Sequence, residues 1–100
     1  MGKVFELIIS DEAAEEIEQL RDFNESRRAG QGFLILEDVL DCIERIQKNP
    51  NSFQYYKTKI EKIRRGLSKK FSIIILYEVD NIHFQIQILA VADSRQNWFQ

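Results

Sequence analysis

The sequence contains few of the residues that cross-link, kink or ligate. Cys42 is its only cysteine, Pro50 its only proline and His83 its only histidine. A single cysteine excludes an internal disulfide, and its position inside an apolar helical pattern predicts a buried structural thiol. One histidine and one cysteine do not make a zinc site. A glycine-rich phosphate loop is also missing, so we expect neither a metal nor a cofactor.

Long apolar runs are absent as well. No stretch approaches the roughly 18 apolar residues that a transmembrane helix needs, and the apolar run at 4–9 is too short for a signal peptide. We therefore expect a cytoplasmic protein with no membrane contact. The chain has 100 residues, of which 44% are hydrophobic and 30% charged, and this composition predicts a single globular domain over residues 1–100.

The net charge of −2 hides an uneven distribution of charge. Residues 1–48 carry 12 acidic and 6 basic side chains, whereas residues 49–100 carry 4 acidic and 8 basic ones. Seven of these basic residues lie between Lys57 and Lys70, where Glu61 is the only acid. Such a basic strip can bind phosphates or acidic side chains. It is also typical of an exposed edge strand, where lysines prevent sheets from pairing.

Hydrophobic periodicity predicts six elements in the order β-α-α-β-β-β. The predicted strands are 4–9, 57–65, 71–79 and 83–91, and the predicted helices are 11–28 and 33–48. Ser10 can cap the first helix, Pro50 ends the second, and Asp80-Asn81 suits a tight hairpin turn. Two helices joined by a short break need an apolar partner layer. We therefore expect an α+β fold in which a helical hairpin packs on a mainly antiparallel sheet.

Spacings of three and four predict the buried face of the second helix. Its members are Phe33, Leu36, Val39, Leu40, Ile43 and Ile46. The acidic residues between them, including Asp38, are predicted to face solvent. Strand 71–79 is apolar on both faces, which predicts a central position in the sheet. The aromatic loop that contains Phe53, Tyr55 and Tyr56 is predicted to close one end of the core.

Taken in order, these pieces resemble the RelE/ParE toxin family of bacterial type II toxin–antitoxin systems, a group that includes plasmid stabilisation proteins. Three motifs carry the resemblance: a helix ending in Ile46-Gln-Lys-Asn-Pro50, the strand pair Ile63 to Leu67 and Phe71 to Tyr77, and the ending Ile88 to Val91 with Arg95 and Trp98. The resemblance implies a RelE/ParE-like two-layer fold. In one departure, Ala92-Asp93 stands where the family usually has a histidine before the terminal arginine.

The resemblance also implies growth inhibition that a cognate antitoxin neutralises. The ParE branch of the family poisons DNA gyrase by binding, whereas the RelE branch cleaves mRNA on the ribosome with basic and aromatic residues. The RelE third-strand arginine would fall near Ile74, so the sequence favours a ParE-like toxin. Two alternatives stay open: a RelE-like ribosome-dependent endoribonuclease, and a degenerate non-toxic member kept as an interaction protein. Whether the chain is an enzyme therefore stays open too.

Cationic residues are the candidates for stabilising a cleaved phosphate if the chain is a ribonuclease. These catalytic candidates are Lys59, Arg65 and Arg95. A general base is harder to find, since His83 is predicted to be exposed and structural, and Glu61 and Glu78 are more typical of pairing charges. The candidates for binding a partner are the other basic residues of the strip and the terminal tryptophan: Lys57, Lys62, Arg64, Lys69, Lys70 and Trp98.

Overall fold

Residues 4–57 and 61–95 are described by the structure, a computed structural model. They form, in chain order, β1 (Glu6–Ile9), α1 (Asp11–Arg27), α2 (Gln31–Lys48), β2 (Arg64–Leu67), β3 (Ile73–Asp80) and β4 (Gln85–Asp93). The strands form one sheet in the order β1-β4-β3-β2, in which only β1 and β4 run parallel. The predicted α+β fold and its β-α-α-β-β-β order are confirmed.

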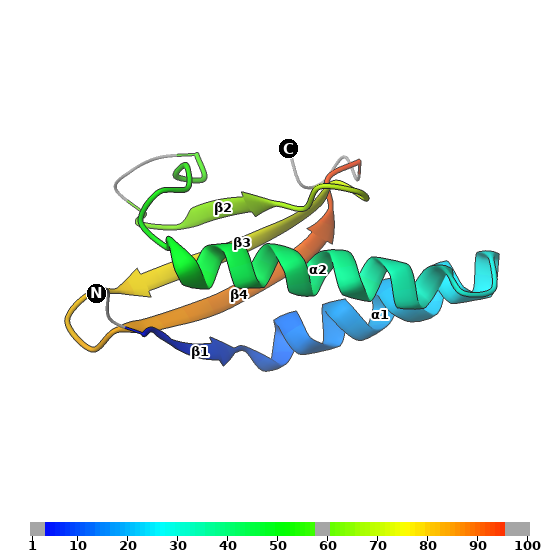
Figure 1. Ribbon diagram of the computed structural model, residues 1–100, viewed down its shortest axis with the longest axis horizontal. Helices are drawn as coiled ribbons and strands as arrows, with labels where there is room; N and C mark the ends of the chain where they lie inside the picture. The colour runs from blue at the N-terminus through cyan, green and yellow to red at the C-terminus, as the bar shows by residue number, and fades with distance from the viewer. Residues whose placement is uncertain (1–3, 58–60, 96–100) are drawn as a thin grey trace.

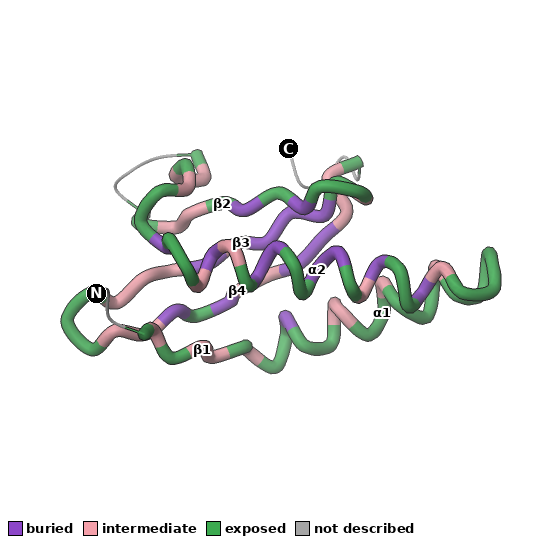
Figure 2. Tube along the Cα trace, viewed as in Figure 1, coloured by how far each residue is buried: buried purple, intermediate pink, exposed green. Residues whose placement is uncertain are grey.

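The helices form an antiparallel hairpin that covers one face of the sheet (Figure 1). Helix α1 packs against β4, whereas α2 packs against β2 and β3. The tip of the hairpin extends beyond the sheet, and its surface is mostly exposed (Figure 2). Among the described residues, no helix has both the length and the apolar character of a membrane span.

Local hydrogen bonds set the ends of the helices. The Ser10 hydroxyl accepts the Ala13 N–H at 3.1 Å and begins α1, as predicted. At the hairpin tip, the Glu25 carboxylate of α1 accepts the N–H groups of Gly30 and Gly32, each at 3.0 Å. A side chain of one helix therefore caps the other, which fixes the turn between them.

The buried face of α2 differs from the predicted one. Phe33 and Leu40 are 63% and 54% exposed, so their predicted burial was wrong. The predicted burial of Val39, Ile43 and Ile46 is confirmed, and Ile35 and Cys42 complete the core side of α2. Phe33 and Leu40 repeat at helical spacing just as the core residues do, so the spacing alone does not tell which side of α2 faces the sheet. The Cys42 thiol is buried as predicted, and burial raises its pKa to about 11.

Asp38 is buried, which overturns its predicted position on the solvent face. Its carboxylate accepts the N–H groups of Phe71 at 2.8 Å and Lys70 at 3.1 Å. Burial by itself would raise the pKa of Asp38, but hydrogen bonds from Ser68, Phe71 and Lys70 lower it below its usual value. The carboxylate thus satisfies backbone donors between β2 and β3 that would otherwise lack partners.

The observed strands differ from the predicted ones at most of their ends, and the largest differences lie at the start of β2 and at the β3–β4 turn. The second strand begins at Arg64 rather than at residue 57, and both Lys57 and Lys62 have positive φ angles of 62° and 61°, which a strand does not allow. The hairpin turn spans residues 81–84 instead of two residues. It is longer because the Asp80 carboxylate accepts the N–H groups of Ile82 and His83.

Gly66 brings β2 into close contact with α2. A Cβ atom at this position would lie 2.8 Å from Ile46 Cδ1 and 3.2 Å from Cys42 Sγ. We predict that Gly66→Ala lowers the free energy of unfolding by about 1–3 kcal/mol, because the added methyl group overpacks the contact. Urea denaturation measures the loss. Ile46→Val removes the opposing methyl group, so the double variant should lose less than the sum of the single losses; strict additivity would contradict the contact.

Asp38→Asn removes the charge that Ser68, Lys70 and Phe71 stabilise. We predict that this substitution lowers the free energy of unfolding by about 1–3 kcal/mol at neutral pH. Because the folded pKa of Asp38 is lowered, its contribution is present above the unfolded pKa of about 3.9 and disappears as the pH falls through the folded value. The free energies of unfolding of the parent chain and the variant should therefore differ more at pH 7 than at pH 3. A gap of constant size would contradict a role for the ionised carboxylate.

Candidate functional site

Arg64 and Arg65 are neighbours on β2 and point to opposite faces of the sheet. Arg64 shares the helix-facing side with its cross-strand partner Tyr77. Its guanidinium donates to the Phe53 carbonyl at 2.6 Å and to the Tyr55 hydroxyl at 2.8 Å, and lies 4.0 Å from the centre of the Tyr55 ring. Arg64 therefore holds the aromatic loop against the sheet, and its guanidinium N–H groups bind other parts of the same chain.

Arg65 belongs to the sheet face that points away from the helices, here called the outer sheet face. Around Arg65 its members include Leu67, Ile74, Leu76 and Ala92, and Glu78 and Gln87 continue it along β3 and β4. Arg65 is exposed and donates to Gln54 Oε1 at 3.0 Å, while Leu67 is 47% exposed. Ile74, near which the resemblance would place the RelE third-strand arginine, is buried close to the start of β3. The face thus combines an exposed cation and an apolar patch at one end with the polar pair Glu78 and Gln87 further along.

Those lysines of the basic strip that the structure describes do not gather at one site. Lys62 lines a hollow beside Arg64, Tyr55 and Asn81, at the end of the sheet where β3 turns into β4. Lys69 and Lys70 follow the other end of β2 and lie beside Asp38 and Asp41 of α2. Lys57 lies 5.2 Å from the Tyr56 ring. The predicted residues Lys59 and Trp98 lie outside the described residues.

Arg95 is paired with a carboxylate directly after β4. Its Nε donates to Asp93 Oδ1 at 2.9 Å and its Nη2 to Asp93 Oδ2, a two-pronged ion pair. Hydrogen bonds from Arg95 lower the pKa of Asp93 below its usual value, against partial burial, which raises it. The guanidinium of Arg95, the terminal arginine of the resemblance, is thus already paired with the Asp93 carboxylate.

His83 is far from Arg95. It lies exposed in the 81–84 turn, where its Nδ1 is 2.8 Å from Asp80 Oδ2. Arg95 follows the opposite end of β4, a strand of nine residues that is about 30 Å long at the usual rise. The two side chains cannot act on one substrate atom. The described residues also contain no group of three or more metal-ligating side chains.

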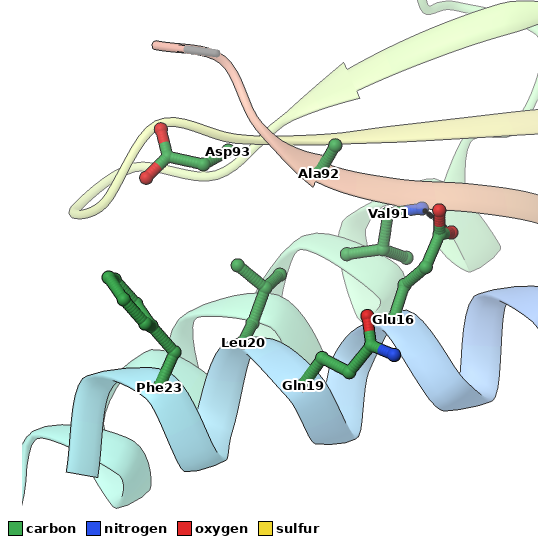
Figure 3. Close-up of a pocket in the computed structure, with 7 residues that line it drawn as sticks. All are labelled: Glu16, Gln19, Leu20, Phe23, Val91, Ala92 and Asp93. Atoms are coloured by element: carbon green, nitrogen blue, oxygen red, sulfur yellow. Dashed lines mark hydrogen bonds between the residues drawn. The ribbon is translucent and has the colours of Figure 1, made fainter. Parts of the chain in front are cut away.

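A hollow that the sequence did not reveal lies between α1 and the end of β4 (Figure 3). Its volume is about 230 Å³, and it is lined by Glu16, Gln19, Leu20, Phe23, Val91, Ala92 and Asp93. Phe23 is 57% exposed, although it lies beside the apolar stripe of α1. Leu20 and Phe23 point from the helix toward the strand end that carries Asp93 (Figure 3). The hollow therefore offers an apolar floor between two carboxylates, Glu16 and Asp93.

Solved structures with this arrangement of elements are toxins and their complexes. A chain of the chromosomal ParDE toxin–antitoxin system of P. aeruginosa superposes with a TM-score of 0.73 at 15% identity, over 90% of this chain and 96% of that one. The chain has the RelE/ParE toxin fold. The RelBE2 complex of Mycobacterium tuberculosis follows with a TM-score of 0.66 at 14% identity, over 91% of this chain and 99% of that one.

A free, mutated RelE of E. coli superposes with a TM-score of 0.71 at 10% identity, over 97% of this chain and 90% of that one. No protein-family model matches the chain, and no curated protein matches its sequence. At these identities the RelE/ParE likeness shows the fold, and the residues at each position must be judged by their own contacts.

The Arg95–Asp93 pair can be tested by titration. We predict that Arg95→Ala raises the pKa of Asp93 toward its usual value, because the variant removes the guanidinium that stabilises the carboxylate. The chemical shift of the Asp93 carboxyl carbon, followed by NMR against pH, measures this change. Arg65→Ala serves as the control, since Arg65 binds Gln54 on the outer sheet face. Equal Asp93 titration curves in all three proteins would contradict the pair.

Proposed function

We propose that this chain is the toxin of a type II toxin–antitoxin pair and that it acts by binding its target, as ParE toxins do. The RelE/ParE toxin fold supports the general function. The observation that carries the finer proposal is the pairing of Arg95 with Asp93. A toxin that works by binding needs a shaped and charged surface, whereas a nuclease needs free catalytic groups.

Cleavage of RNA through its 2′-hydroxyl needs a base, an acid and a cation that converge on one phosphate. In the described part of the chain, His83 and Arg95 lie at opposite ends of β4. Arg64 is used in holding the aromatic loop. These positions argue against a catalytic set assembled around Arg95.

The charge of the two layers supports separate surfaces for the target and the antitoxin. Helices α1 and α2 carry eleven acidic and four basic side chains, a net charge of −7. The whole chain has a net charge of −2, so the remaining residues are basic overall. We propose that the basic, sheet-side surface around Lys62 and Arg65 meets the target, for which the resemblance names DNA gyrase, and that the acidic helix layer meets the antitoxin.

A RelE-like endoribonuclease is the second candidate. The structures of RelE and RelBE2 have TM-scores close to that of ParDE. The exposed Arg65 on the outer sheet face, on which Tyr56 also packs, favours this candidate, because a cation beside an aromatic ring can hold an RNA strand.

Pulse-labelling after induced expression in a bacterium separates the two candidates. We expect DNA synthesis to fall before protein synthesis, because a ParE-like toxin blocks the enzyme that relieves supercoiling. An earlier fall of protein synthesis would support the RelE-like nuclease instead. Continued growth with both rates unchanged would contradict a toxin and support the degenerate, non-toxic alternative.

Substitution of the two arginines gives an independent test of the mechanism. We predict that Arg95→Ala inhibits growth as the parent chain does, because Arg95 is already neutralised by Asp93. Arg65→Ala should weaken inhibition partly, because it removes one surface charge. Colony counts after induction measure the effect, with thermal unfolding as the control for folding. Abolished inhibition in both folded variants, with RNA cleavage by the parent chain, would establish the nuclease.

A further inference from the structure

Strand β1 forms one edge of the sheet, and no strand lies on its outer side in the described part of the chain (Figure 1). Its inner side pairs with β4, where the Glu6 N–H donates to the Phe84 carbonyl at 2.8 Å. Backbone groups alternate between the two sides of a strand. The N–H and C=O groups of Phe5, Leu7 and Ile9 therefore point away from β4, toward the open edge.

The two edges of the sheet are protected to different degrees. At β2, the Arg65 N–H donates to the Gln54 carbonyl at 2.8 Å, and Arg65 itself carries an exposed charge. Strand β1 contains no lysine, arginine or proline, the residues that usually prevent an edge from pairing. The Phe5 carbonyl accepts Gln47 Nε2 at 3.2 Å, but a carbonyl oxygen has a second lone pair. The β1 edge is thus the less protected of the two.

The side chains along β1 are mostly apolar. Phe5, directly before the strand, and Leu7 pack against the core on the helix side of the sheet. Ile9 points to the same side and is 38% exposed, and Val4 is 90% exposed. Glu6 is the only charged residue of β1. An apolar edge with outward backbone donors and acceptors is a template for a further strand.

We propose that two copies of this chain pair through β1, antiparallel, about a two-fold axis at Leu7. This inference does not depend on the toxin function. In this register Leu7 lies opposite Leu7 of the second copy, and Phe5 lies opposite its Ile9. The outward backbone groups of these three residues then exchange hydrogen bonds. Glu6 lies opposite Ile8 of the second copy, so no like charges meet directly across the pair.

The composition of the edge favours a second copy over a charged segment of another protein. A two-fold contact needs a surface that is complementary to itself. The register meets this need, because the apolar row of Phe5, Leu7 and Ile9 continues the core side from one copy into the other. The Glu6 carboxylate already accepts Gln85 Nε2 at 3.0 Å. The edge therefore offers little free charge with which to attract a segment of opposite charge.

The size and the charge of the contact define its strength. The paired stretch, residues 5–9, is about 17 Å long and buries far less than the roughly 1,600 Å² of a standard interface, so the dimer is weak. Directly opposed residues share a face of a sheet, so both helix layers, each of net charge −7, lie on one face of the joined sheet and repel. Salt screens this repulsion and should strengthen the dimer, whereas salt weakens the binding of a basic segment.

The test is sedimentation equilibrium of the full chain between about 10 and about 500 µM, since association depends on concentration. Ile9→Lys adds a charge at the open edge. Leu40→Lys is the matched control, because it makes the same change at a 54% exposed position on α2. We expect Ile9→Lys to raise the dissociation constant of the dimer about tenfold or more, and Leu40→Lys to change it less than about threefold.

Thermal unfolding checks that both lysine variants fold. A parent chain that stays monomeric at the highest concentration would overturn the proposal. The reverse order of effects would place the dimer contact on the exposed side of α2 and would overturn it as well. A dimer that weakens as NaCl rises from about 50 to about 500 mM would contradict the arrangement with both helix layers on one face.

Amide hydrogen exchange locates the contact without any substitution. The Leu7 and Ile9 amides should exchange at least about threefold more slowly at high than at low protein concentration. The Leu67 amide of β2 is the control, since by alternation from Arg65 it points away from β3 at the opposite edge. Protection of Leu67 instead would overturn pairing through β1. Protection of Leu7 and Ile9 only after addition of the protein from the adjacent reading frame would assign the edge to a foreign strand and overturn self-association.

Discussion

The fit of α2 against the sheet is the constraint on which the rest of the structure depends. Ile46 occupies the space left by the missing side chain of Gly66, and the fully buried Tyr77 donates its hydroxyl to the Pro50 carbonyl at 2.8 Å. Burial also raises the pKa of Tyr77 above its usual value, which keeps that donor protonated. The end of α2 is thereby fixed to the central strand, and Phe53 packs edge-to-face on Tyr77, with ring centres 6.1 Å apart.

That fit also decides which basic residues are available to a partner. Arg64 holds the aromatic loop against the sheet, whereas Arg65 lies on the opposite face. Lys62 lies at one end of β2, and Lys69 and Lys70 lie at the other. A strip that is continuous in sequence is therefore several small surfaces in space, which suits contact with a broad protein target better than the concentrated charge of a catalytic centre.

Long, strongly periodic segments were predictable, whereas short polar ones were not. Both helices and the central strand followed from spacing and capping residues, and the RelE/ParE order of elements was visible in the motifs. The side of α2 that would be buried was ambiguous, because Phe33–Leu40 and Ile35–Ile46 both repeat every three to four residues. Asp38 looked like a solvent-facing acid, since its backbone partners lie more than thirty residues away. The hollow at Phe23 depends on where β1 stops beside β4, which no local pattern encodes.

Asp93 links the terminal arginine to the acidic helix layer that we assign to the antitoxin. Its side chain binds Arg95, and the same residue lines the hollow between α1 and the end of β4. A partner bound over the hollow would therefore touch the residue that holds Arg95. A histidine at this position would lose the permanent negative charge and with it the two-pronged contact. The aspartate thus favours a toxin that acts by binding over one whose terminal arginine is free to stabilise a cleaved phosphate.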